Sequence, residues 1–237
     1  MIKLSNLFIA IAFFSCVSEN EKIALDKIKS LYQTEDVEIA FGFDASTEEG
    51  SNRYISLEIE NSPIVNSDGY NVDYAGSTSA IVLFQQLTDE QFEKYDLVKT
   101  LVITDDNNKK SSFEYSYTLD QLNSVQRSYN FLEDFLNKLK LDDFSGASEM
   151  FADSFFEQIS KADLINSLSS INSDFGSIKN VQLVGFELTK AEFRGEDVPV
   201  IQVWGMNEHE RGNTTTKYLV RMDGPKVKIV AIEINSW

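Results

Sequence analysis

Hydrophobic and polar positions follow two periods along the first half of the chain. Some segments place apolar side chains at helical spacing, and others place one at every second position, which is typical of strands with one buried and one solvated face. The expected segments are a helix over 19–33, strands over 37–43 and 55–59, a helix over 79–87 and strands over 97–104 and 112–118. The order helix-strand-strand-helix-strand-strand predicts an N-terminal α+β unit.

Two capping boxes mark helix starts in this region. Thr88 stands three residues before Gln91, and Thr118 stands three residues before Gln121. A hydroxyl at the first position and a carboxamide three residues later can satisfy free backbone N–H groups at a helix start. Apolar residues at helical spacing follow the second box, so this helix carries the chain into a second unit.

The second unit begins with helical patterns and ends with strands. One apolar stripe of a helix consists of Phe144, Ala147, Phe151, Phe155 and Ile159. A further helix starts after Ser160 and ends at Gly176, a residue suited to a helix C-cap. Strands are expected over 181–193, 198–206, 214–222 and 227–234. Short, turn-rich connections join these strands, so we expect an antiparallel four-stranded meander beneath three helices, again an α+β arrangement.

The N-terminus has a different pattern. Lys3 precedes eight consecutive apolar residues over 7–14. As a helix this run is ~12 Å long, well short of the ~30 Å hydrocarbon core, so it cannot cross a bilayer. A basic segment followed by a short apolar run is the layout of a secretory signal. Cys16, the single cysteine of the chain, follows directly after Ser15.

This arrangement resembles the signal peptide of bacterial lipoproteins, which ends in a cysteine that is acylated. Ser15 matches the small residue of that pattern, and the bulky Phe14 departs from it. The resemblance implies a signal peptide over 1–15, lipid attachment at Cys16 and a lipidated tether over 16–19. It also implies a location in the bacterial cell envelope, with the outer membrane favoured. Acidic residues soon after Cys16 resemble the signals that direct some lipoproteins to the cell surface.

Residues 128–237 resemble the nuclear-transport-factor-2-like (cystatin-like) superfamily. The resemblance lies in the order of three helices, the Phe175-Gly176 stop before the first strand, and the closing strand pattern over 226–234. It implies a cone whose sheet wraps a pocket, which some members use for catalysis and many for binding. We therefore expect an N-terminal α+β domain over 20–127 packed against a C-terminal cone over 128–237.

Composition limits the classes of partner. The chain has 21 Lys+Arg against 38 Asp+Glu, a net charge of −17, which argues against nucleic acid and favours a basic protein partner. One Cys and one His exclude an internal disulfide framework and a Cys/His zinc site. The 17 Phe and 9 Tyr residues are far more than a disordered chain would carry.

The sequence carries no recognisable catalytic or metal-binding pattern. No G-x-S-x-G is present, and the single histidine, His209, falls in an expected hairpin turn, where we expect it to be solvated. Asp44-x-Ser46-x-Glu48 supplies alternate oxygens, but Gly50 stands one position too late for a calcium loop of the EF-hand type. We therefore predict no catalytic residue, no metal and no cofactor.

A candidate ligand site lies on the strands of the second unit. Trp204, Tyr218 and Met222 fall on adjacent expected strands, where they either line an apolar pocket or belong to the core under the helices. The sequence thus favours a non-catalytic, lipid-anchored envelope protein that binds a small apolar ligand or a partner protein. Two alternatives stay open. One is a cone-type isomerase or dehydratase that uses a buried carboxylate with Tyr218 or His209, and the other is an acidic inhibitor or immunity-type protein.

Overall fold

The computed structural model describes residues 18–46, 50–106, 109–193, 195–223 and 226–236. The chain divides into two compact units, one ending at Leu122 and the other beginning at Asn123. This division falls inside the long helix α4 (Leu119–Lys140), five residues before the end expected at residue 127. The hydrophobic period of a continuous helix has no break, so the pattern alone does not locate a boundary within it.

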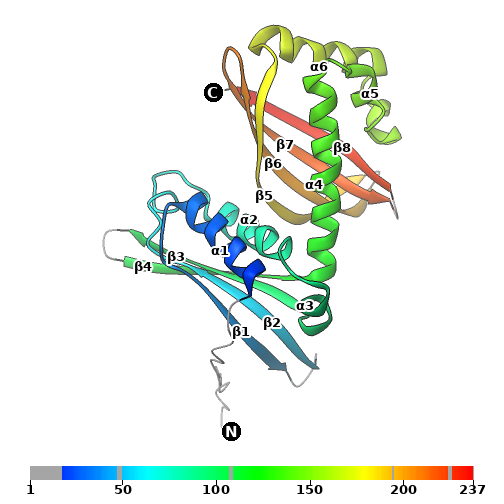
Figure 1. The fold of residues 1–237 in the computed structure, drawn as a ribbon. Helices are drawn as coiled ribbons and strands as arrows, with labels where there is room; N and C mark the ends of the chain where they lie inside the picture. The colour runs from blue at the N-terminus through cyan, green and yellow to red at the C-terminus, as the bar shows by residue number, and fades with distance from the viewer. Residues whose placement is uncertain (1–17, 47–49, 107–108, 194, 224–225, 237) are drawn as a thin grey trace. The chain divides into compact units, whose positions relative to one another are not determined.

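The first unit is a four-stranded mixed sheet with helices, in the predicted order (Figure 1). Its elements are α1 (Glu19–Tyr32), β1 (Val37–Ser46), β2 (Gly50–Ile59), α2 (Val72–Phe84), α3 (Asp89–Lys94), β3 (Leu97–Asp106) and β4 (Lys109–Thr118). The strand order is β1-β2-β3-β4, with β2 and β3 parallel and the other neighbours antiparallel. Helices α2 and α3 fill the connection between the parallel strands, because a parallel pair requires a long crossover.

Side-chain caps set the helix starts of this unit. Helix α2 begins at Val72, earlier than the expected residue 79, because Asn71 Oδ1 accepts a hydrogen bond of 3.0 Å from the N–H of Asp73. Both predicted capping boxes are confirmed. The N–H of Gln91 donates to Thr88 Oγ1 at 3.3 Å, and the N–H of Gln121 donates to Thr118 Oγ1 at 3.1 Å.

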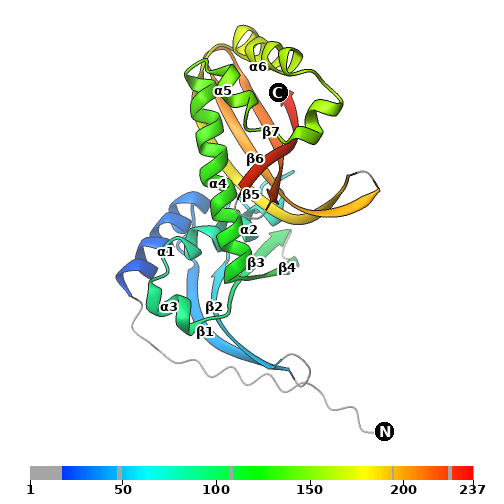
Figure 2. The same cartoon turned by 90° about the vertical axis from the view of Figure 1, so that its right-hand side faces the viewer.

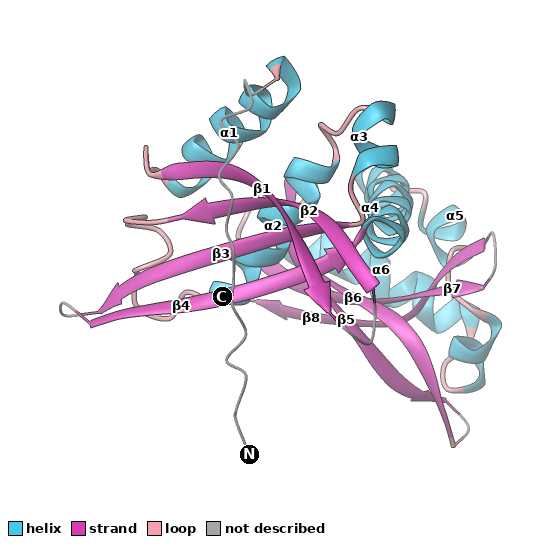
Figure 3. Cartoon of the chain, turned by 90° about the horizontal axis from the view of Figure 1, so that it is seen from below, coloured by secondary structure: helices cyan, strands magenta, loops and turns pink. Residues whose placement is uncertain are grey.

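Helices α1 and α2 lie on one face of the first sheet (Figures 1 and 3). The strands turn Ile55, Leu57 and Val98, all fully buried, toward the core. Helix α2 approaches β4 closely at Gly76, because the ring of Tyr115 occupies the space where a Cβ would stand. The Tyr115 hydroxyl also donates a 2.7 Å hydrogen bond to Asp73 Oδ1, which fixes the ring against the helix.

The second unit combines helices with the predicted four-stranded antiparallel meander, and the fold class α+β is confirmed. After α4 come α5 (Phe144–Ser148), η1 (Asp153–Glu157), α6 (Lys161–Phe175), β5 (Ile178–Phe193), β6 (Glu196–His209), β7 (Asn213–Asp223) and β8 (Lys226–Ser236). Consecutive strands pair in the order β5-β6-β7-β8. Figure 2 shows that the hairpin of β5 and β6 is long and strongly curved.

The apolar stripe expected to form one helix from Phe144 to Ile159 is broken in two. Phe151 instead makes a parallel β-bridge with Ile229 of β8. The N–H of Ala152 donates to the Ile229 carbonyl at 2.8 Å, and the Ile229 N–H donates to the Met150 carbonyl at 3.1 Å. This segment therefore hydrogen-bonds to the edge of β8 and does not continue as a helix. The backbone groups at a strand edge offer it an alternative to helical hydrogen bonds.

Side chains alternate between the two faces of the second sheet. We call the face that packs under α4 the inner face, where Val203 and its cross-strand partner Tyr218 are fully buried and Tyr218 packs edge-on against Phe135 of α4 at 6.1 Å. The opposite or outer face carries Trp204 and its cross-strand partner Lys217. Because the pleat has a period of two, neighbouring residues on one strand reach opposite environments.

The close approach at Gly76 generates the first prediction. Alanine normally stabilises a helix interior by about 1 kcal/mol relative to glycine. Gly76→Ala should instead lower the free energy of unfolding by about 1–3 kcal/mol, because its Cβ would overlap the Tyr115 ring. Urea unfolding of Gly76→Ala, Tyr115→Ala and the double variant measures the coupling. In the Tyr115→Ala background, Gly76→Ala should lower the free energy of unfolding much less than it does in the wild type. An equal loss with and without the Tyr115 ring would show that the ring does not obstruct the alanine.

Candidate functional site

The predicted lipid-attachment residue, Cys16, lies outside the described residues. The described chain starts at Ser18, whose hydroxyl accepts a hydrogen bond from the Glu21 N–H while the Glu21 carboxylate accepts one from the Ser18 N–H. Helix α1 thus begins at Glu19, three positions after Cys16. Glu21 is almost fully buried and also accepts a hydrogen bond from Gln91, so α1 is fixed to the remainder of the unit at its first turn.

The three residues predicted to line an apolar pocket do not come together. Tyr218 lies on the inner face, at 1% exposure, opposite Val203. Trp204 lies on the outer face, opposite Lys217. Met222 pairs with Val227 at the end of β7, but its side chain lies outside the described part of the structure. The strand assignment was right for all three, but Trp204 and Tyr218 point to opposite sides of the sheet.

Tyr218 belongs to a polar network on the inner face. Its side chain hydrogen-bonds with those of Thr216 and Asn207, and burial raises the pKa of its hydroxyl well above the ordinary value of 10. Asn207 Nδ2 donates to Thr216 Oγ1 at 2.8 Å and to Thr214 Oγ1 at 3.1 Å. Within the described residues Asn207 Oδ1 has no hydrogen-bond partner. A tyrosine held in its protonated form here can donate a hydrogen bond but is poorly suited to act as a base.

His209 extends the same network, and the expectation that it is a solvated turn residue was wrong. It is 4% exposed, because β6 continues to this residue and the turn begins only after it. Nδ1 lies 3.1 Å from the carbonyl of Gly176, the C-cap of α6, and Nε2 lies 3.1 Å from Thr214 Oγ1. The alternation through Val203, Gly205 and Asn207 is the sequence signal that places His209 on the inner face.

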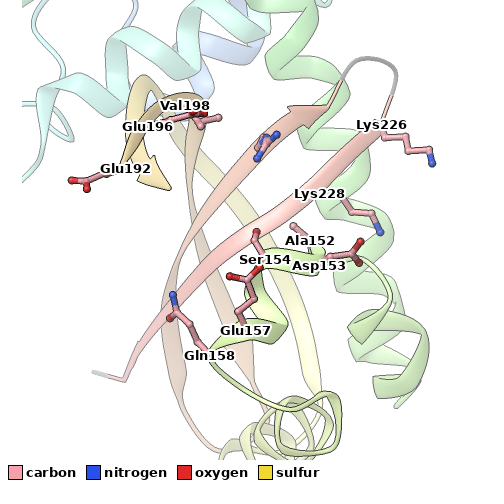
Figure 4. Close-up of a pocket in the computed structure, with 11 residues that line it drawn as sticks. Ala152, Asp153, Ser154, Glu157, Gln158, Glu192, Glu196, Val198, Lys226 and Lys228 are labelled. Carbon is pink, nitrogen blue, oxygen red and sulfur yellow. The ribbon is translucent and has the colours of Figure 1, made fainter. Parts of the chain in front are cut away.

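A cleft lies on the outer face, formed by residues that no pattern in the sequence connects. It is a cleft of about 730 Å³ between η1, the tip of the β5–β6 hairpin and the adjoining ends of β7 and β8. Figure 4 shows η1 in front of the sheet and α4 behind it. We call it the outer cleft. Its lining residues are Ala152, Asp153, Ser154, Glu157, Gln158, Glu192, Glu196, Val198, Arg221, Lys226 and Lys228.

Opposite charges reach the outer cleft from different elements. The cations Arg221, Lys226 and Lys228 come from β7 and β8, whereas the carboxylates come from η1 and the hairpin tip. Arg221 and Lys228 are directly paired across the two strands. Lys228 Nζ donates a 2.6 Å hydrogen bond to the Glu149 carbonyl and extends toward Asp153 (Figure 4).

An ion pair supports the edge of the outer cleft. Lys161, the first residue of α6, pairs with Glu149, and its hydrogen bond lowers the pKa of that carboxyl below its usual value. The nearby charge of Lys228 acts on Glu149 in the same direction. Glu149 precedes Met150 and the bridge to β8, so this pair holds η1 beside the sheet.

The described part of the chain holds neither a metal-binding cluster nor a helix long and apolar enough to cross a membrane. In that part, no cluster of three or more His, Cys, Asp or Glu side chains is arranged to hold a metal ion. None of the helices described there combines the length and apolar character needed to cross a membrane.

Comparison with known proteins gives distant structural likeness. No family model matches the chain, and no curated protein is similar to it. Among solved structures, Bd1075 of Bdellovibrio bacteriovorus is similar at a TM-score of 0.37 and 11% sequence identity, over 62% of this chain and 53% of that chain. The match therefore spans about half of the length of Bd1075. This likeness is too distant to support a fold or a function.

The buried hydroxyl of Tyr218 generates the second prediction. Its raised native pKa means that, above about pH 10, the unfolded state binds fewer protons than the native state, so stability falls as pH rises. Tyr218→Phe removes this contribution. The stability difference between wild type and variant should therefore narrow between about pH 8 and pH 11, measured by urea unfolding. Tyr32 and Tyr115, whose pKa values are also raised, are present in both proteins and cancel. A constant difference across this range would contradict the assignment.

Proposed function

We propose that the protein is a non-catalytic binding protein, held at a lipid surface through Cys16, whose second unit binds a charged or zwitterionic ligand in the outer cleft. The observation that carries this proposal is the meeting of three cations, Arg221, Lys226 and Lys228, with four carboxylates at one concavity. The charged lining favours such a ligand over the apolar one that the sequence indicated.

The geometry of the inner face supports a structural role for the groups with catalytic potential. Tyr218, Asn207 and His209 are each at least 94% buried. Asn207 and His209 both hydrogen-bond with the hydroxyl of Thr214 on the adjacent strand. A catalytic acid or base must reach the proton that it transfers, directly or through one water. The outer cleft, by contrast, is open to a ligand, and its cations and carboxylates lie where an ionic ligand can reach them (Figure 4).

The start of α1 supports a short tether. With lipid on Cys16, only two residues would separate the acylated position from the first residue of the helix. The net charge of −17 opposes contact with anionic headgroups, so the acyl chains rather than a basic face would hold the protein. Two or more chains anchor stably, whereas one chain is marginal.

Cys16 provides a direct test of anchoring. Cells of a bacterial host with lipoprotein-processing enzymes would express wild type or Cys16→Ala with an alkyne analogue of palmitate in the medium. Wild type should incorporate the label and fractionate with membranes, and Cys16→Ala should lose the label entirely, because the chain has one cysteine. An unlabelled wild type, or label retained in the variant, would refute the lipid anchor.

The outer cleft is tested with a matched pair of charge reversals. Purified protein is screened by thermal shift against fractions of envelope extract, since a ligand that binds the native state raises the melting temperature. Lys226→Glu should abolish the shift produced by an active fraction. Lys190→Glu, an exposed lysine on β5 outside the cleft, should retain the shift. If no fraction stabilises the wild type, or if both variants respond equally, the cleft is not the binding site.

A further inference from the structure

A second hollow lies on the same outer face, toward the other end of β6. Its volume is about 220 Å³, and it is separate from the outer cleft. Asn207 and Thr214, whose side chains hydrogen-bond to each other, are among its lining residues. The remaining lining residues are Asn180, Gln182, Met206, Glu208 and Asn213. Strand register brings these side chains together, because Gln182 pairs with Met206, and Glu208 pairs with Asn180 on one side and Asn213 on the other. We call it the amide hollow.

Three carboxamides in this hollow have hydrogen-bond donors or acceptors that bond to no described residue. Asn180 Oδ1 accepts from the N–H of Val181 at 3.0 Å, which leaves its amide donors. The side chains of Gln182 and Asn213 make no hydrogen bond to any described residue. Each carboxamide offers two donors and an acceptor. Such groups suit a ligand that carries adjacent hydroxyls, because a hydroxyl also donates and accepts.

Apolar surface flanks these amides. Met206 is 41% exposed although it sits in the middle of a sheet. Trp204 precedes it by two residues on β6, so its partly buried indole lies on the same face, about 7 Å along the strand. Broad apolar side chains beside unsatisfied polar groups can pack on the C–H surface of a polar ring.

The charges of the amide hollow select against acidic ligands. None of its lining residues is Lys or Arg, and Glu208 contributes a carboxylate. The hollow is also smaller than the ~300–1,000 Å³ of pockets that enclose a whole drug-sized ligand, so one ring of a longer chain fits better than a complete molecule. The ligand that fits the amide hollow is therefore uncharged and carries several hydroxyls and C–H faces. A sugar has all of these properties.

We propose that the amide hollow and Trp204 form a binding site for a neutral oligosaccharide that runs along β6. One sugar ring occupies the hollow, where Gln182, Asn180 and Asn213 bond its hydroxyls, and the next ring packs against Trp204. This site is distinct from the outer cleft, shares no lining residue with it, and does not depend on its ligand.

The test uses the full chain with Trp237→Phe, which leaves Trp204 as the one tryptophan. The protein is purified in a detergent without a sugar headgroup and titrated with maltohexaose, cellohexaose and chitohexaose, and with hexagalacturonate as an acidic probe. At least one neutral hexasaccharide should bind with a Kd below about 1 mM by calorimetry. Binding should shift the emission of Trp204, and hexagalacturonate should bind at least tenfold more weakly.

Matched variants locate the site. Gln182→Ala and Asn213→Ala, which change side chains without structural hydrogen bonds, should each weaken binding about tenfold, or ~1.4 kcal/mol. Asn123→Ala, an exposed asparagine on α4, should bind as wild type does. Absence of binding by all three neutral probes, equal binding of hexagalacturonate, or unchanged affinity in both variants would overturn the proposal. Binding without a change in Trp204 emission would remove the indole from the site.

Discussion

The two-residue pleat of β6 and β7 is the constraint on which the second unit depends. It sends Val203 and Tyr218 to the inner face and Trp204 and Lys217 to the outer face. A slip of one residue in this register would exchange the two sets and place a lysine under α4. The composition of each surface of this unit therefore depends on the register of these two strands, more than on the identity of any one side chain.

The inner polar network helps to fix that register. Asn207, Thr214 and Thr216 hydrogen-bond across β6 and β7, and His209 connects the sheet to the end of α6 through Gly176. Such bonds add only about 1 kcal/mol each to stability, but a buried polar group without a partner costs about 1–3 kcal/mol. An alternative pairing would leave several such groups unsatisfied, so the network disfavours wrong registers more strongly than it stabilises the right one. This role accounts for polar residues that would otherwise suggest an active site.

The outer face has different chemistry at its two ends. The outer cleft contains the cross-strand pair Arg221 and Lys228, together with Lys226, opposite several carboxylates. The amide hollow contains carboxamides and Met206, with no cation. Trp204 stands on β6 between them, two residues from Met206 and six residues from Val198 of the cleft. Because β6 rises about 3.3 Å per residue, the two concavities are separate sites on one strand.

Much of the architecture could be predicted from local patterns. Capping at Thr88 and Thr118, the strand periods and the short turns identified the α+β class, the element order and the antiparallel meander, because each depends on residues close in sequence. The break at Phe151 could not be predicted, since it depends on the edge of β8, almost eighty residues later. The pattern does not locate the division between the units within α4 for a related reason, because a helix continues its pattern regardless of what it packs against.

The candidate sites divide in the same way. The sequence by itself determined the acidic charge, the single cysteine after a run of apolar residues and the presence of Trp204 and Tyr218 on neighbouring strands. Only the tertiary structure decided that these two aromatic residues face opposite sides, that His209 is buried, and that cations from β7 and β8 meet carboxylates from η1. The physical reason is that composition and period are local properties, whereas a site is formed by distant segments whose register and packing bring them together.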